Sequence, residues 1–86
     1  MKEFTQEMLE TLQKANNEVR GTKDYTKYLI CCEAKTYGRW HFIGWHYPYT
    51  TGKIKTFKGR TYIITENSTG QYRYEVTDEV KNLLNI

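Results

Sequence analysis

Near the N-terminus, apolar residues recur every three or four positions, which is the spacing of one helix face. They are Met8, Leu9, Leu12, Ala15 and Val19. Thr5 stands where it can cap the first turn, and Phe4 stands where it can pack against Leu9. Gly21 follows the last apolar position and is a typical helix stop. The pattern predicts an amphipathic helix that ends before Gly21 and packs against a sheet.

From Tyr25 onward the hydrophobic period changes from helical spacing to alternation, and turn residues separate the alternating runs. The runs predict five antiparallel strands, over 25–34, 39–47, 53–57, 60–66 and 71–76. Thr77 and Asp78 are natural caps for a short C-terminal helix with Val80, Leu83 and Leu84 on its apolar side. The order of elements predicts an α+β fold: an antiparallel sheet of about five strands, curled or forming a small open barrel, with the N-terminal helix on one face.

Alternation also sorts the side chains of the first two predicted strands into two faces. With a turn at Tyr37 and Gly38, Cys32 opposes Ile43 and Ile30 opposes Trp45, so these apolar pairs form the predicted core face, with His41 near its edge. The other face collects Leu29, Cys31, Glu33, Lys35, Trp40, Phe42 and His46. Unless another element covers its rings, this face is typical of a protein-binding surface, for which Trp40, Phe42 and His46 are the candidate residues.

The three later strands divide in the same way. Their predicted core face contains Ile54, Thr56, Thr61, Ile63, Thr65, Tyr72, Tyr74 and Val76. Their second face contains Lys53, Lys55, Phe57, Arg60, Tyr62, Ile64, Arg73 and Glu75. The place of Arg73 depends on the loop over 67–70, because an odd number of loop residues would turn the last strand over.

Length and composition indicate one folded domain over 1–86. Charged residues are 27% of the 86, but aromatic residues are 15%, which argues against a disordered chain. No apolar run approaches the length of a membrane span, and acidic residues occupy the N-terminal region where a signal peptide would be apolar. We therefore expect a cytoplasmic protein without a membrane-embedded part.

The net charge of +3 is unevenly distributed along the chain. The stretch from Lys2 to Glu18 is rich in acids, whereas the stretch from Lys53 to Arg60 holds four cations and no acid. Cations interleaved with rings on a sheet can neutralise phosphates while the rings stack on bases, and a sheet can also enter a duplex groove. The candidate nucleic-acid-binding residues are Lys53, Lys55, Phe57, Arg60, Tyr62 and Arg73. The plainer interpretation is that the lysines protect an edge strand and the rings pack under the helix.

The sequence contains no complete catalytic constellation. Cys31 and His46 form a conceivable pair, but no orienting third group or oxyanion donor accompanies them. The adjacent Cys31 and Cys32 are expected to be reduced thiols, and neither has a histidine at metal-ligand spacing. We therefore expect no enzyme activity, no metal and no cofactor.

Two binding functions remain, and the localised charge puts nucleic acid first. The alternative is a protein-binding inhibitor, adaptor or regulator, of the kind that phages and mobile elements encode, which would use the aromatic face around Trp40 and Phe42. A homodimer through this face is a further alternative, since it would cover the rings.

Overall fold

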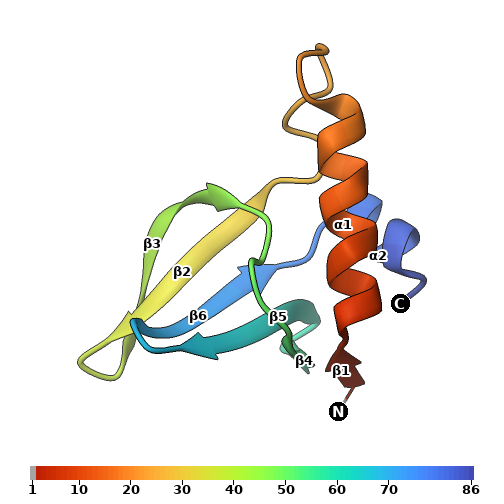
Figure 1. Ribbon diagram of the computed structural model, residues 1–86. Coiled ribbons are helices and arrows are strands. Elements are labelled where there is room, and N and C mark those ends of the chain that lie inside the picture. Colours follow the sequence, from red (N-terminus) through yellow and green to blue (C-terminus); the bar gives the residue numbers. More distant parts are fainter. Residues whose placement is uncertain (1) are drawn as a thin grey trace.

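The computed structural model describes residues 2–86, which form a six-stranded antiparallel sheet and two helices. In chain order the elements are β1 (Lys2–Phe4), α1 (Gln6–Val19), β2 (Ile30–Thr36), β3 (Arg39–His46), β4 (Gly52–Phe57), β5 (Arg60–Asn67), β6 (Gly70–Glu75) and α2 (Asp78–Leu84). The order across the sheet is β1-β4-β5-β6-β2-β3 (Figure 1), so the sheet is not closed and β1 and β3 are its edges. The predicted α+β class is confirmed.

Helix α1 begins as its sequence predicts. The Thr5 side chain accepts a hydrogen bond from the Met8 amide, and the buried side chains of Leu9 and Leu12 face the sheet. Burial of each leucine contributes about 1.5–3 kcal/mol. Phe4 is buried in the same cluster, but it belongs to a strand, β1, that pairs with β4. The sheet therefore has six strands where the sequence indicated five, because three residues are too few to show alternation.

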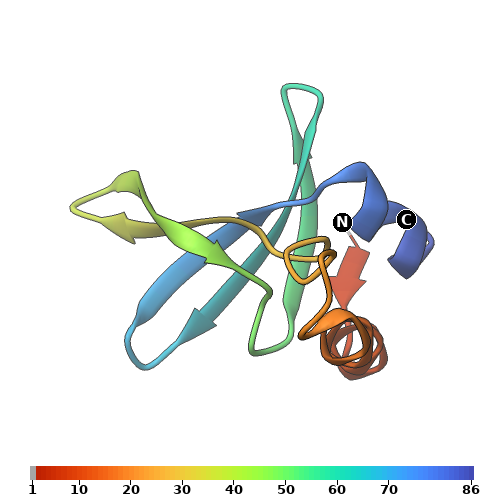
Figure 2. The same ribbon diagram turned by 90° about the horizontal axis from the view of Figure 1, so that it is seen from above.

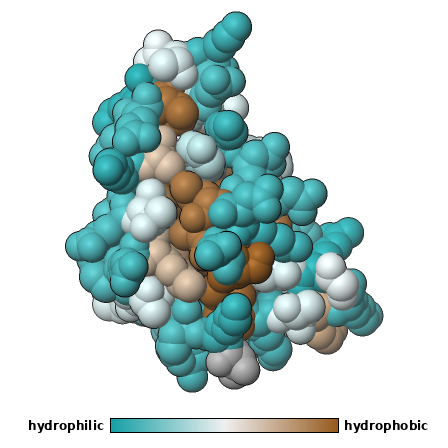
Figure 3. Space-filling model, turned by 90° about the vertical axis from the view of Figure 1, so that its right-hand side faces the viewer, coloured by the Kyte–Doolittle hydropathy of each residue, from teal (hydrophilic) through white to brown (hydrophobic). Residues whose placement is uncertain are grey.

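Both helices lie on the same face of the sheet, and the core lies between them and that face. In Figure 2 the two helices stand together on the right, while the β2–β3 and β5–β6 hairpins extend to the other side. The buried core consists of Phe4, Leu9, Leu12, Ile30, Cys32, Ile54, Ile63, Tyr74, Val76, Val80 and Leu84. Half-buried Met8, Leu83 and Ile86 pack at its rim, and apolar surface is seen on this side of the molecule in Figure 3.

The strand predicted from Tyr25 begins only at Ile30. Residues 22–29 form successive turns, in which the Tyr25 amide bonds to the Thr22 carbonyl and the Leu29 amide to the Thr26 carbonyl. The Thr22 hydroxyl donates to the Val19 carbonyl and accepts from the Asp24 amide. These local side-chain bonds satisfy the backbone and compete with strand pairing.

The predicted register of the first hairpin is wrong beyond Phe42, because β3 contains a bulge. Cys32 pairs with Gly44 and Ile30 with His46, and Gly44 adopts φ 152°, a backbone angle that favours glycine. Ile43 is the extra residue, so every later side chain changes face.

The bulge corrects the predicted faces of Ile43, Trp45 and His46. Trp45 leaves the core side, joins the face of Phe42 and is 62% exposed, and Ile43 is also exposed. His46 moves the other way, to the side of Ile30, so it does not belong with the rings of Trp40 and Phe42. His41 keeps its predicted face but is exposed, since it lies near the tip of the hairpin.

The faces predicted for the later strands are confirmed. Two-residue turns join β4 to β5 and β5 to β6, with Phe57 opposite Arg60 and Asn67 opposite Gly70. The even loop length keeps Arg73 on its predicted face, opposite Ile64.

Alkaline pH is predicted to destabilise the fold through its buried hydroxyl and thiol. Burial raises the pKa of Tyr74 well above its ordinary value, with Cys32 contributing, and burial also raises the pKa of Cys32. The unfolded chain loses these protons at about pH 8.5 and 10, so the free energy of unfolding should fall as pH rises through this range. Urea unfolding at several pH values between 7 and 11 measures this free energy.

The substitution Tyr74→Phe removes the phenol and should make this alkaline loss smaller, even if it lowers stability at pH 7. Tyr37→Phe is the matched control, because Tyr37 is fully exposed at the β2–β3 turn and should leave the slope unchanged. Equal slopes for the wild type and Tyr74→Phe would contradict the prediction.

Candidate nucleic-acid interface

The sheet face turned away from the two helices is called the outer face below. Strand register places on it Lys53, Lys55 and Phe57 of β4, Arg60, Tyr62 and Ile64 of β5, Gln71, Arg73 and Glu75 of β6, Cys31, Glu33 and Lys35 of β2, and Trp40, Phe42 and Trp45 of β3. All six residues predicted to bind nucleic acid therefore share one face. Trp40 and Phe42 lie on that face too, whereas His46 does not. From the sequence, the nucleic-acid-binding residues and the rings of Trp40 and Phe42 are assigned to two separate surfaces. Because β2 pairs with β6, the two surfaces are continuous.

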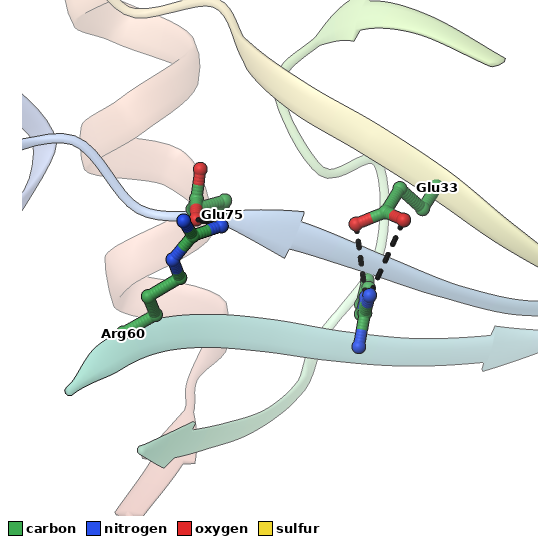
Figure 4. A network of polar contacts seen from close by, with 4 residues as sticks. Glu33, Arg60 and Glu75 are labelled. Carbon is green, nitrogen blue, oxygen red and sulfur yellow. Dashed lines mark hydrogen bonds and ion pairs between the residues drawn. The ribbon is translucent and has the colours of Figure 1, made fainter. Parts of the chain in front are cut away.

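Arg73 lies in the middle of the outer face, where its guanidinium group pairs with a carboxylate and stacks against two rings. Its Nε and Nη2 atoms donate to the two carboxylate oxygens of Glu33 at 3.0 and 3.2 Å (Figure 4). Its guanidinium carbon lies 4.7 Å from the ring centroids of both Trp40 and Tyr62. We call these four residues the Arg73 cluster; a bidentate, stacked guanidinium fixes side-chain positions.

The cluster changes the role of two predicted site residues. The Arg73 side chain is only 23% exposed and already paired, so it is a positioning residue for the face. The Tyr62 residue is 8% exposed and lies against Arg73, so its ring has little free surface on which a base can stack. No helix covers Tyr62; neighbouring side chains of the same face do.

Arg60 makes the second ion pair, but near the surface. Its Nη1 atom lies 3.1 Å from a Glu75 carboxylate oxygen (Figure 4), and its side chain is 68% exposed. A hydrogen bond to Tyr62 and the nearby Glu75 carboxylate raise the pKa of Arg60, so it carries its charge at every physiological pH. Such exposed pairs exchange readily with other anions, because they are weak in water.

The lysines on and beside the outer face differ from Arg60 and Arg73 in their acidic partners. Within residues 2–86, Lys35, Lys53, Lys55 and Lys58 make no ion pair. The chain between Glu33 and Glu66 contains six Lys and Arg residues and no acid. Since Glu33 and Glu75 are matched by the two arginines, the lysines supply the excess positive charge of the outer face.

Two of these lysines, Lys35 and Lys55, border a hollow of about 280 Å³ on the outer face. It is lined by Lys35, Trp40, Lys55, Phe57, Tyr62, Ile64, Gln71 and Arg73. Phe57 is 53% exposed, with the Lys58 ammonium 5.4 Å from its ring centroid, and the Lys35 ammonium lies 5.6 Å from that of Trp40. Sequence reasoning did not select Lys35, because only the pairing of β2 with β6 brings it beside the later strands. It did not select Gln71 either, although alternation along β6 places Gln71 on the face of Arg73.

The structure separates the one conceivable catalytic pair. Cys31 lies opposite Trp45 and His46 opposite Ile30, so the thiol and the imidazole are on different faces. Burial and the charges of Glu33 and Glu75 raise the pKa of Cys31, which disfavours its thiolate. Residues 2–86 contain no group of three or more His, Cys, Asp or Glu side chains arranged to hold a metal ion.

Comparisons of the chain with protein-family models, with curated proteins and with solved structures find no match. Among residues 2–86, neither helix has the length and apolar character needed to cross a membrane.

The two arginines are predicted to differ in their effect on stability. Arg73→Ala should lower the free energy of unfolding by about 2–3 kcal/mol, because it removes charge-assisted hydrogen bonds and leaves the partly buried Glu33 unpaired. Arg60→Ala is the matched control and should cost clearly less stability than Arg73→Ala, since its ion pair is exposed. Urea unfolding at pH 7 measures both.

The conservative variant tests the geometry of the cluster. Arg73→Lys keeps the charge but loses the planar fork, so it should recover less than half of the lost stability. Equal costs for the two alanine variants, or full recovery by lysine, would contradict the structural role of Arg73.

Proposed function

We propose that this protein is a non-catalytic module that binds single-stranded nucleic acid on its outer face. The observation that carries the proposal is the gathering of lysines without ion pairs around the rings of Trp40 and Phe57, beside one hollow. The exposed ring of Phe57 and the half-buried ring of Trp40, on a positively charged sheet, fit unpaired bases, whose faces can stack, better than a closed duplex.

The proposal gives each group of residues a distinct role. Lys53 and Lys55 of β4 contact phosphates, as expected from the sequence, and Lys35 of β2 adds a third cation across the hollow. Arg60 contacts a phosphate by exchanging Glu75 for it. Phe57 and Trp40 stack on bases, while Tyr62 and Arg73 hold these groups in place without direct contact.

The lysines are predicted to make binding salt-dependent. With three or four phosphate contacts, the logarithm of the affinity for oligo(dT) should fall against the logarithm of salt concentration with a slope of about −2 to −3. Lys55→Glu should weaken binding and make the slope shallower. Fluorescence anisotropy of labelled dT15 at several salt concentrations measures both, with a 15-base-pair duplex for comparison.

Lys14→Glu is the matched control for Lys55→Glu. Lys14 is exposed on α1, so the substitution changes the net charge equally but at a distance from the outer face. Equal weakening by the two variants would show attraction by net charge alone, and binding that does not respond to salt would also reject the proposal.

The ring of Phe57 is predicted to contribute to binding without contributing to the fold. Phe57→Ala should weaken oligo(dT) binding by about tenfold or more, because stacking on one base is worth roughly 1–3 kcal/mol. Its thermal unfolding should stay close to that of the wild type, because the ring is half exposed. Tyr37→Ala, another exposed ring, is the control, and unchanged binding by Phe57→Ala would exclude stacking at this position.

A further inference from the structure

Strand β3 is a long edge of the sheet that carries little charge and no proline, and its protection is the bulge at Ile43. It is eight residues long, whereas the opposite edge strand, β1, has three residues, of which Lys2 and Glu3 are charged. From Trp40 to Trp45, β3 contains no Lys, Arg, Asp, Glu or Pro. Natural sheets guard their edges with charges, prolines or short strands, because the unpaired backbone groups of an edge accept another strand.

Three of the five exposed side chains of β3 are large and apolar. Phe42, Ile43 and Trp45 are 58%, 49% and 62% exposed, and the rings of Phe42 and Trp45 meet edge to face at 5.9 Å. Beside them, Thr26, Leu29 and Trp45 line a hollow of about 380 Å³. Binding hot spots are commonly formed by aromatic residues beside a pocket. A partner strand can therefore form hydrogen bonds with the backbone of this edge and place one of its side chains in the hollow.

The charges of this region determine which occupant fits the edge. Arg39, opposite Thr36, is the only Lys, Arg, Asp or Glu residue of β3, and Lys35 of β2 lies opposite Trp40, on the other face of the sheet. A second copy of β3 would bring another Arg39 and no acid, so a copy of this chain is a poor neighbour. A strand with Asp or Glu side chains complements both cations.

We propose that β3 docks an extended, acidic segment of a partner protein, which adds to the sheet as a further strand. The segment pairs with the regular part of β3, Arg39–Phe42, because the bulge interrupts the ladder at Ile43. An apolar side chain of the segment occupies the hollow beside Trp45. This surface adjoins the oligonucleotide site and shares Lys35 and Trp40 with it, but its own hollow, beside Trp45, is lined by residues that the oligonucleotide site does not use.

A random peptide library tests the proposal with the full chain as the target. Peptides of about twelve residues, twice the usual strand length, should be enriched in Asp, Glu and β-branched residues. When a selected peptide is added, hydrogen exchange of those amides within Arg39–Phe42 that point away from β2 should slow by about tenfold or more, since strand addition protects them. Enrichment of no sequence or of basic sequences, or protection elsewhere in the chain, would overturn the proposal.

Two variants and a control separate this site from the oligonucleotide site. Trp45→Ala should weaken the selected peptide by about tenfold or more, while Phe57→Ala, which removes an equally exposed ring on β4, should not. Arg39→Glu should change the preference of the library from acidic to basic peptides. Peptides that respond to Phe57→Ala but not to Trp45→Ala, or a protein that sediments as a dimer with these amides already protected, would reject the acidic partner.

Discussion

The two helices cover only one face of the sheet, so the outer face has to be ordered by its own side chains. The Arg73 cluster provides that order with residues from four strands: Arg73 from β6, Glu33 from β2, Trp40 from β3 and Tyr62 from β5. It joins the β2–β3 hairpin to the β5–β6 hairpin across forty residues of sequence. Arginine suits this position because its planar guanidinium can pair with a carboxylate along its edge and stack against rings with its faces.

The same cluster divides the cations of the outer face into two kinds. Arg73 is satisfied inside the protein and partly buried, so a ligand phosphate would have to break an existing bidentate pair to reach it. Lys35 and Lys55 lie at the rim of the hollow, and lysine binds anions as a simple point charge. In the proposed function, rigidity and reversible binding therefore come from different residue types. The total of positive residues in the sequence therefore overstates how many are free to bind.

The sequence predicts the three later strands well because their turns are short and even. Lys58-Gly59 fixes one register, and the two-residue turn before Gly70 fixes the next, so the face of Arg73 follows from alternation alone. Its partner does not follow, because the pairing of β2 with β6 brings Glu33 to Arg73 over a long separation. The burial of Tyr62 was missed for the same reason.

Other errors had a local signal in the sequence. Gly44 inside an alternating apolar run is typical of a bulge, and a bulge there returns Trp45 to the side of Phe42. The Thr22-Lys23-Asp24 stretch favours turns over a strand. Strand β1 had no such signal, because its three residues are ordered by pairing with β4 and by burial of Phe4 alone.

The bulge also explains how β3 can expose large apolar side chains without pairing with one copy of the chain after another. Uninterrupted alternation along β3 would send Trp45 towards the helices, whereas the extra residue at Ile43 turns it outward beside Phe42. The same residue interrupts the ladder, so a regular added strand meets only the four residues before it. A short ladder of backbone hydrogen bonds is too weak to hold identical chains of like charge. A partner that supplies acids and an apolar side chain gains affinity from the backbone hydrogen bonds, from charge pairing and from burial of that side chain. The edge is therefore selective for its occupant because of the defect in its strand.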